Sequence, residues 1–492
     1  TGYSLLLPAS FCASVIFTCV VVTPNIIDNY ITTCALRKEA IAKSGIISLG
    51  CPRNLVDSEI LLGILEDNGF QISELVEADI GIINTCAFID EAKRESIDMI
   101  LEVIDLKKKG RLSKVIVAGC LAERYGNALM KDMPEVDGFI GCGDIEKIGA
   151  LIGKLNNKEA VSEISKTHSF IYSHTHPRVK ITPPHYMYVK ISEGCRNRCS
   201  FCVIPDIKGD YRSRPLESVL REVEDASRRA HISEINLVGQ DTTLFGTDLT
   251  PTRCADTPRR CTINKLLKQL CAFNKYKRWI RLLYTYPSHI DDSLISLFAD
   301  EKSLCKYIDL PVQHINDRIL KAMNRHMSKR DICGIIEKIR KAIPGVTLRS
   351  SIIVGFPGET EKEFKELVDF IKDVKFERLG VFTYSREEGT PAYSYKDQIS
   401  EKIKLERFNT LMSLQRDIAE DINRSFLGKT IDVLIDEKDE DAEDSYIGRT
   451  EGDAPEVDGE VFVKGRGLKP GDFAKVKITG TLEYDLMGEA LE

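Results

Sequence analysis

The segment from Ser192 to Cys202, with the sequence SEGCRNRCSFC, places three cysteines in a C-x3-C-x2-C spacing. The three are Cys195, Cys199 and Cys202, and the next cysteine along the chain is Cys254. Four thiolates would complete the coordination of a four-iron cluster, whereas three leave one iron open to another ligand. The alternative is zinc, but zinc knuckles usually consist of two C-x2-C halves. The spacing therefore favours a reactive iron–sulfur cluster over structural zinc.

Strand-like and helical stretches alternate on both sides of this segment and fit a partial TIM-like (β/α) barrel. The expected strands cover residues 186–191, 234–238, 281–284, 307–310, 347–354 and 379–382. Barrel enzymes place their sites at the carboxyl ends of the strands. The segments at those ends are Gly239-Gln240-Asp241, Gln313-His314 and Gly355-Phe356-Pro357-Gly358. Each glycine by itself is better explained as a turn residue.

The same alternation begins earlier, from Gly45 to about residue 142, and predicts a doubly wound parallel sheet. Cys51, Cys86 and Cys120 each come directly after an apolar strand. The carboxyl ends of parallel strands form the ligand-binding edge of such a sheet, so these thiols can converge there. Taken singly, each is better explained as a small buried apolar residue. Cys142 occupies a comparable position and competes with the other three on this argument.

Length and composition describe an ordinary globular protein of several domains. The chain has 492 residues, of which 43% are hydrophobic and 29% charged, and its length predicts two to four domains. The net charge of −7 argues against a nonspecific phosphate binder. An odd count of 15 cysteines without regular disulfide spacing indicates a reducing compartment, and we expect a cytoplasmic protein with thiolates used as ligands.

Residues 1–44 are expected to form an appended extension that takes no part in the chemistry. The stretch from Leu5 to Val22 is uncharged, which leaves a membrane anchor as the alternative, but no basic residue precedes it. Two further stretches fall outside the predicted domains. Residues 161–181 are polar and suggest a linker, and the stretch from Thr250 to Asn264, with Cys254 and Cys261, suggests an inserted surface loop.

The C-x3-C-x2-C segment, with the aromatic Phe201 before its last cysteine, resembles the radical S-adenosylmethionine (SAM) superfamily. The resemblance implies that the open iron binds the amino and carboxylate groups of SAM. One electron then cleaves the cofactor and releases a 5′-deoxyadenosyl radical. By the same resemblance, the residues expected to contact SAM are Phe201, Gly239, Gln240, Asp241, Arg349 and Gly355.

Residues 45–492 as a whole resemble the methylthiotransferases, a radical SAM family with two [4Fe–4S] clusters. The resemblance implies that Cys51, Cys86 and Cys120 bind the second cluster, which holds an exogenous sulfur, and it assigns no role to Cys142. It also implies three domains: an α/β domain over 45–160, a radical SAM domain over 182–426, and a small antiparallel β-barrel, the TRAM domain, over 427–492. Strands of that barrel are expected at 430–435, 459–463 and 473–478.

The family divides between enzymes that modify adenosine of transfer RNA and enzymes that modify an aspartate β-carbon in protein twelve of the small ribosomal subunit. Four segments resemble the ribosomal-protein branch, the RimO type. They are Ser48–Glu59, Asn84–Lys93, Gln240–Thr243 and Gly448–Gly459. Residues 427–492 also contain 8 Lys and Arg against 18 Asp and Glu, a net charge of −10. Such a tail attracts a basic ribosomal protein and repels phosphate, although plain solubility also explains it.

The resemblance further implies that one SAM methylates the sulfur and that a second yields the radical that removes a hydrogen from the aspartate. An unactivated C–H bond has no acidic proton, so acid–base catalysis alone is insufficient. We expect a flavodoxin or ferredoxin as electron donor, no stable membrane partner and a monomeric protein. The competing hypotheses are a transfer-RNA methylthiotransferase and a noncatalytic ribosome-associated protein that uses its clusters structurally.

Overall fold

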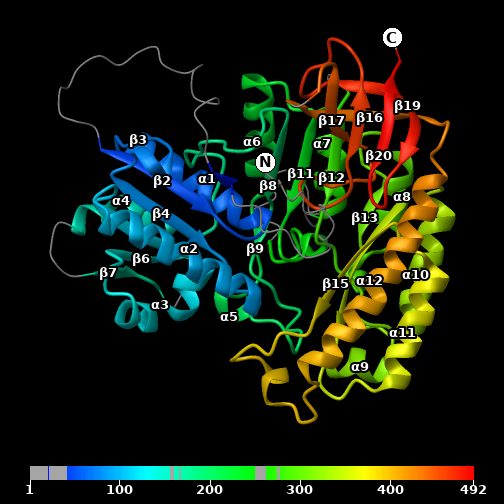
Figure 1. The fold of residues 1–492 in the computed structure, drawn as a ribbon, viewed down its shortest axis with the longest axis horizontal. Helices are drawn as coiled ribbons and strands as arrows, with labels where there is room; N and C mark the ends of the chain where they lie inside the picture. The colour runs from blue at the N-terminus through cyan, green and yellow to red at the C-terminus, as the bar shows by residue number, and fades with distance from the viewer. Residues whose placement is uncertain are drawn as a thin grey trace, which may run out of the picture.

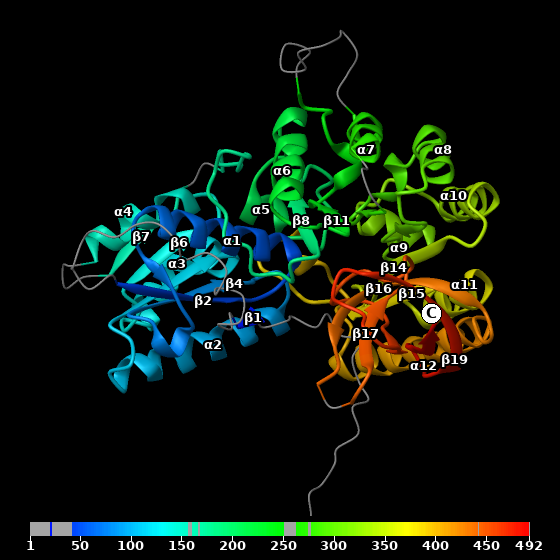
Figure 2. The same ribbon diagram turned by 90° about the horizontal axis from the view of Figure 1, so that it is seen from above.

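The computed structural model describes residues 20–21, 42–155, 160–165, 168–249, 262–273, 277–440 and 442–491. It contains an N-terminal α/β domain beside a central domain, with a small C-terminal barrel packed against the central domain (Figures 1 and 2). One apolar core joins all three, because it includes Ile46, Tyr188 and Leu434. In the part of the chain that the structure describes, no helix is long and apolar enough to cross a membrane.

The N-terminal domain is a doubly wound parallel sheet, as the sequence predicts. Its strand order is β3-β2-β4-β5-β6-β7, and β1 (Val20–Val21) pairs antiparallel with β2. The strands are β2 (Lys43–Ser48), β3 (Gln71–Ile72), β4 (Ile80–Thr85), β5 (Lys114–Gly119), β6 (Gly138–Gly141) and β7 (Val161–Glu163). The helices are α1 (Pro52–Asp67), α2 (Asp90–Lys108), α3 (Cys120–Asp132) and α4 (Ile148–Lys154).

Alternate strand residues enter two separate cores, which explains why this sheet has helices on both faces. Ile82 packs in the core that contains α1 and α4, whereas its neighbour Ile83 packs in the core that contains α2 and α3. Both faces are therefore apolar and must be covered. The strand order reverses between β2 and β4, and such a switch point is where sheets of this type bind ligands.

The central domain is an open barrel made of two three-stranded parallel sheets, ordered β8-β11-β12 and β13-β14-β15. An isolated parallel bridge between Ile280 and Leu304 connects them. The strands are β8 (Tyr186–Lys190), β11 (Glu234–Val238), β12 (Trp279–Leu282), β13 (Tyr307–Asp309), β14 (Thr347–Val354) and β15 (Arg378–Thr383). The covering helices are α6 (Leu216–Arg229), α7 (Ile263–Ala272), α8 (Asp292–Asp300), α10 (Lys329–Ala342), α11 (Glu361–Val374) and α12 (Glu401–Arg424).

The strand boundaries expected for this barrel are confirmed to within two residues. Because the strands of each sheet run parallel, the helices that connect them cover the outside of the barrel. Short elements complete the domain near the strand ends: β9 (Ser192–Glu193), β10 (Arg212–Ser213), α5 (Ile204–Lys208) and α9 (Asp317–Ala322). Residues 250–261, which contain Cys254 and Cys261 of the predicted surface loop, lie outside the described residues.

The C-terminal domain is a closed five-stranded barrel in the order β16-β17-β18-β20-β19. Its strands are β16 (Thr430–Lys438), β17 (Ser445–Arg449), β18 (Val461–Lys464), β19 (Phe473–Thr481) and β20 (Leu486–Ala490). All pairs are antiparallel except β18 and β20, which run parallel. Closure leaves no free strand edge for association with another chain.

Candidate active site

The cysteines of the N-terminal sheet lie at its carboxyl edge. Cys51 follows β2 and caps α1, Cys86 follows β4, and Cys120 is the first residue of α3 directly after β5. The three strands are adjacent and parallel, so their ends meet at one edge of the sheet. Cys51 and Cys86 flank the point at which the strand order reverses. The structure thus brings together the three cysteines that the sequence analysis singled out.

Buried side chains fix the three cysteine loops relative to one another. The Asn54 side chain donates to the carbonyl of Leu49 (2.6 Å), and the Asn84 side chain donates to the carbonyl of Asn54 (2.8 Å). The Thr85 hydroxyl donates to the carbonyl of Ala118 at 2.6 Å. Hydrogen bonds that satisfy buried polar groups also rigidify their surroundings. The thiols are therefore held in place by the protein before any ligand binds.

The thiols are close enough to influence one another's titration. Burial raises the pKa of Cys86 well above its usual value, and the neighbouring thiols of Cys120 and Cys51 raise it further. A hydrogen bond with Cys142 lowers the pKa of Cys120 to about 7, against the effect of burial. Thiols that crowd together in this way are stabilised as thiolates when iron replaces their protons.

Cys142 lies beside Cys120 but is turned toward the central domain. Its thiol donates to the carbonyl of Ile207 in α5 (3.2 Å) and lies 3.6 Å from a carboxylate oxygen of Glu123. Because α5 begins two residues after Cys202, this contact brings the edge of the N-terminal sheet next to the second cysteine group. Cys142 therefore stays an alternative to Cys51, Cys86 and Cys120 as a ligand at this edge of the sheet.

The second cysteine group occupies the loop that follows β8 and β9. Gly194 begins this loop with a φ of +75°, and a Cβ atom at this position would lie 2.3 Å from the carbonyl of Asp210. Only glycine fits there. Burial raises the pKa of Cys195 to about 11 and raises that of Cys202 further above its usual value. The thiols of Cys195 and Cys202 therefore stay protonated at neutral pH unless a metal displaces their protons.

No group of three or more His, Cys, Asp or Glu side chains in the described residues converges tightly enough to hold a single metal ion. In a [4Fe–4S] cluster each thiolate binds a different iron, so the ligands stand further apart. The donor sets, three thiols each on a rigid loop, fit such a cluster.

The Gly239-Gln240-Asp241 segment packs on the cysteine loop, as its position after β11 led us to expect. The Gln240 side chain donates to Glu193, two residues before Cys195, at 2.6 Å. The fully buried Asp241 accepts a 2.7 Å hydrogen bond from Asn197, which lies between Cys195 and Cys199. This segment therefore fixes the geometry of the loop.

The remaining residues expected to contact SAM are placed differently. Phe201 packs in one apolar cluster with Phe356, which follows Gly355 at the end of β14. The N–H of Gly355 donates to Glu359 at 2.5 Å. Arg349 lies in the third position of β14 and pairs with Asp309 (3.2 Å) and with Asp458 of the C-terminal barrel (3.4 Å). Arg349 is thus engaged away from the cysteine loop.

The loop from Arg449 to Asp458, between β17 and β18, covers the opposite, amino end of the central strands. Arg449 binds Glu234 at the start of β11 (2.7 Å), and Asp453 binds Arg378 at the start of β15 (2.5 Å). Asp458 accepts from the hydroxyl of Tyr307 at the start of β13 (2.7 Å). Several acidic groups of the C-terminal domain are therefore neutralised internally, which reduces the charge that its surface offers to a partner.

Two arginines that the sequence analysis did not single out lie at the cysteines. Arg53 donates to the sulfur of Cys51 (3.3 Å), and its guanidinium lies 4.3 Å from the ring centroid of Tyr284. Arg325 lies 3.7 Å from the sulfur of Cys199 and 4.0 Å from the ring centroid of Tyr286. The only local signal was the adjacency of Arg53 to Cys51, since the tyrosines are distant in sequence.

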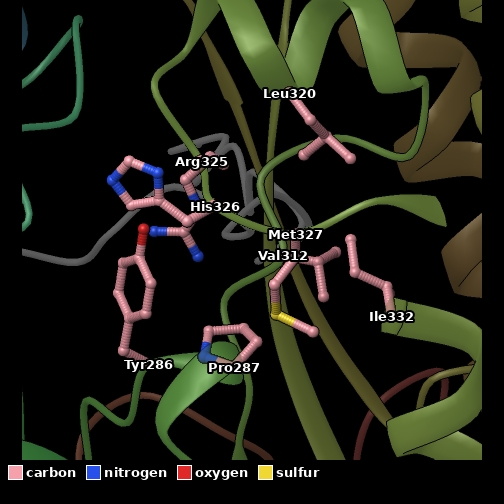
Figure 3. A pocket seen from close by; sticks show the side chains of 8 residues that line it. All are labelled: Tyr286, Pro287, Val312, Leu320, Arg325, His326, Met327 and Ile332. Carbon is pink, nitrogen blue, oxygen red and sulfur yellow. The ribbon is translucent and has the colours of Figure 1, made fainter. Parts of the chain in front are cut away.

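A small pocket opens beside Arg325 at the carboxyl ends of β12 and β13 (Figure 3). Figure 3 shows Arg325 and His326 gathered around Tyr286, with apolar side chains on the other side. The lining residues are Tyr286, Pro287, Val312, Leu320, Arg325, His326, Met327 and Ile332. The pocket therefore adjoins the cysteine loop through Arg325.

Buried charges join the two domains behind the cysteines. Asp57 of α1 accepts from Lys190 of β8 and from Lys208 of α5, the latter at 3.0 Å. Glu193 also binds Lys190, at 2.6 Å. Although burial alone would raise the pKa of Glu193, the charges of Lys190 and Lys208 hold it well below its usual value. The network fixes the position of one cysteine group relative to the other.

Comparison with known proteins supports each domain separately. Residues 189–371 match the Radical SAM superfamily, residues 43–141 match Uncharacterized protein family UPF0004, and residues 427–491 match the TRAM domain. Among solved structures, the radical S-adenosylmethionine methyltransferase TsrM from Kitasatospora setae has a TM-score of 0.50 at 16% identity, covering 70% of this chain and 74% of its own. That likeness concerns the fold alone.

Curated relatives match along nearly the whole chain. A protein from Pelotomaculum thermopropionicum, described as "Ribosomal protein uS12 methylthiotransferase RimO", is 46% identical over 91% of this chain and 99% of its own length. A relative of the same description from Desulforamulus reducens is 46% identical over 90% of this chain and 98% of its own length. A third, from Clostridioides difficile, is 43% identical over 91% of this chain and 99% of its own.

Proposed function

This chain belongs to the family of ribosomal protein uS12 methylthiotransferases, and we propose that it adds a methylthio group to the β-carbon of an aspartate in that small-subunit ribosomal protein. The relatives carry this description at 43–46% identity over about nine-tenths of the chain. The cysteine loop at the carboxyl ends of the barrel strands fits the same chemistry.

The radical SAM domain implies S-adenosylmethionine and one [4Fe–4S] cluster as cofactors. Cys195, Cys199 and Cys202 are the residues that would hold this cluster, since their loop is fixed by Asn197 and Asp241. We assign a second [4Fe–4S] cluster to Cys51, Cys86 and Cys120, whose loops are tied together by buried hydrogen bonds.

When bound, these groups supply a carbon radical from an unactivated C–H bond and a methylthio group to quench it. The protein positions the two cysteine groups. The observation that carries the proposal is the position of Arg53, which reaches from the Cys51 sulfur (3.3 Å) to the carbonyl of Gly239 (3.4 Å), in the segment that packs on the second cysteine loop. A substrate side chain held at this contact would be within reach of both groups.

A basic protein substrate suits the C-terminal barrel better than transfer RNA does. Some acidic groups are paired internally, but others remain exposed on the barrel surface. Among the described residues, the exposed acids are Glu437, Glu440, Glu443, Glu451, Glu456, Glu460, Asp472, Glu483 and Glu489, against seven exposed cations, Lys429, Lys438, Lys464, Arg466, Lys469, Lys475 and Lys477. Exposed carboxylates repel a phosphate backbone and attract Lys and Arg side chains. We further propose that the protein acts in the cytoplasm as a monomer and takes electrons from a flavodoxin or ferredoxin.

Mass spectrometry of the small-subunit ribosomal protein tests this function. In cells that lack the gene, the methylthio mass increment on the aspartate should disappear, and the intact gene should restore it. Persistence of the modification in the deletion strain would refute the proposal. Methylthio-adenosine in transfer RNA serves as the control and should be unchanged.

A further inference from the structure

Arginines in the interior of this protein are generally paired with carboxylates. Arg178, Arg214, Arg281, Arg349, Arg378, Arg407 and Arg449 all form ion pairs with Asp or Glu. The two arginines at the cysteine groups differ: among the described residues, neither Arg53 nor Arg325 has an Asp or Glu oxygen within 4.0 Å. A partly buried guanidinium without an anion is costly, so these two positions point to a ligand.

Arg53 is held rigidly yet keeps part of its guanidinium free. Its Nε donates to the Cys51 sulfur, its Nη1 donates to the Gly239 carbonyl, and Tyr284 covers one face. Its Nη2 forms no hydrogen bond with any described residue, and the side chain is partly exposed. A guanidinium held through Nε and Nη1 keeps Nη2 as its one free edge, and a charged N–H donor fixed in this way is suited to bind one oxygen of a carboxylate.

Arg325 lacks this opening. Its Nη2 donates to the carbonyl of Pro311 at 2.5 Å, its Nη1 faces the sulfur of Cys199, and only 9% of the residue is exposed. Arg325 therefore offers no comparable edge to a substrate. The pair of arginines provides a natural comparison, since both stack on tyrosines of the same strand end.

Arg53 also lies where the reaction must take place. It comes from the N-terminal domain, whereas Gly239 and Tyr284 come from the central domain. It touches the Cys51 sulfur of the first cysteine group and the carbonyl of Gly239. The neighbouring Gln240 binds Glu193, two residues before Cys195 of the second group. The guanidinium therefore stands between the two groups, and a ligand on its free edge would lie between them as well.

We propose that Arg53 binds the side-chain carboxylate of the substrate aspartate and makes the enzyme select aspartate over uncharged side chains. This proposal rests on the proposed function. A single C–C bond joins that carboxylate to the β-carbon, so anchoring the carboxylate fixes the position of the β-carbon. A site that pairs with a charge also rejects an analogue that lacks it, because the guanidinium is then left unpaired.

A simpler role for Arg53 would be to offset the negative charge of nearby thiolates. In that role Arg53 would interact with the cysteines alone, and peptide affinity would not depend on the substrate side chain. The two roles therefore differ in one measurable respect, the dependence of peptide affinity on the aspartate charge. Iron content tests the simpler role independently. If Arg53 only offsets thiolate charge, a variant without this charge should hold less iron.

The test measures binding of two peptides to the full-length, iron-loaded protein with SAM. Both peptides copy the modified segment of the ribosomal protein, one with aspartate and one with asparagine at the target position. The wild-type protein should bind the aspartate peptide about ten- to a hundredfold more tightly, as expected for a hydrogen-bonded charge pair. Arg53→Gln should abolish this preference without weakening binding of the asparagine peptide, and Arg53→Lys should retain part of it.

Arg228→Gln, which replaces an exposed arginine on α6 away from both cysteine groups, is the control and should keep the full preference. The proposal is overturned if Arg53→Gln still prefers the aspartate peptide. It is also overturned if the variant binds both peptides more weakly by the same factor and holds less iron. If the wild-type protein binds neither peptide, the proposed function itself fails, and the inference falls with it. If the wild-type protein binds both peptides equally, the function stands but charge recognition by Arg53 is refuted.

Discussion

The guanidinium of Arg53 lies 4.3 Å from the ring centroid of Tyr284, so a cation of the N-terminal domain stacks on an aromatic side chain of the central domain. Tyr284 adopts a φ of +59°, a conformation that is uncommon for a bulky residue. Such strain persists where the surroundings enforce it, as at functional sites. Here the N–H of Tyr284 donates to Asp309 at 2.8 Å and holds the ring under Arg53.

Replacing Tyr284 by alanine should slow methylthio transfer about tenfold, because a cation–π contact of this kind contributes roughly 1–2 kcal/mol to positioning the guanidinium. Tyr284→Phe keeps the aromatic face and should stay close to wild type. Product formation is measured by mass spectrometry of the peptide. Equal rates for the alanine and phenylalanine variants at wild-type level would contradict the role of the ring.

Alanine at Cys51, Cys86 or Cys120 should lower the iron content of the reconstituted protein from about eight to about four per chain, because each cluster holds four irons. Alanine at Cys195 should do the same and also stop 5′-deoxyadenosine formation. The exposed Cys333 supplies the control and should change neither quantity when replaced. A wild-type protein that binds only about four irons would eliminate the second cluster.

Asp57→Asn should destabilise the protein by about 3–5 kcal/mol, because it leaves Lys190 and Lys208 facing each other with one carboxylate fewer in a buried site. The free energy of unfolding is measured with urea. Glu224→Gln breaks an exposed pair with Arg228 and should cost less than about 1 kcal/mol. Similar losses in both variants would show that the network contributes no special stability.

Stability should decline between about pH 4.5 and pH 7 because of Glu359, which accepts the backbone N–H of Gly355. Burial raises the pKa of Glu359 from 4.5 to about 7, although Arg407 opposes this effect. The folded state thus favours the protonated form, and that contribution is lost as pH rises through the folded pKa. Urea unfolding across this range should show the decline in wild type and a smaller one in Glu359→Gln; parallel curves would refute the assignment.

Reversing the charge of Glu437, Glu440 and Glu443 to lysine should weaken binding of the ribosomal protein, with a smaller effect at high salt, because exposed charges are screened. Lysine at Glu66 and Asp67, exposed on the N-terminal domain, provides the control. Binding is followed by fluorescence anisotropy at two ionic strengths. An equal loss in both variants would indicate a nonspecific charge effect rather than docking on the barrel.

Much of the architecture follows from local sequence patterns. Strands such as β11 and β14 were predicted with the boundaries that the structure has, because continuous apolar runs between turn signals have few alternatives. The two-residue strands β1, β3, β9 and β10 and the barrel strands β17 and β20 were not predicted, and β7 lies in the stretch that was interpreted as a linker. Such short elements form through pairing with distant partners, which no local window contains.

Part of the negative charge of the C-terminal domain is paired inside the molecule. The net charge of residues 427–492 suggested an acidic surface, yet Asp453 and Asp458 bind Arg378 and Arg349 inside the molecule. Composition counts charges but does not distinguish an internal ion pair from an exposed carboxylate. Only the described positions of Glu437, Glu440 and similar residues identify the charge that a partner can meet.

The sequence by itself predicted one set of cysteines, Cys195, Cys199 and Cys202, because spacing within a loop is a local property. Position after a strand left Cys142 in competition with Cys51, Cys86 and Cys120, and only the resemblance to a family selected those three and implied the three domains. Only the tertiary structure decided how the sets face each other. Arg53 meets Gly239, 186 residues away in the chain, because buried ion pairs such as Asp57 of α1 with Lys208 of α5 hold the N-terminal domain against the central domain. Contacts between residues so far apart depend on packing and charge pairing across a domain interface, which no local pattern encodes.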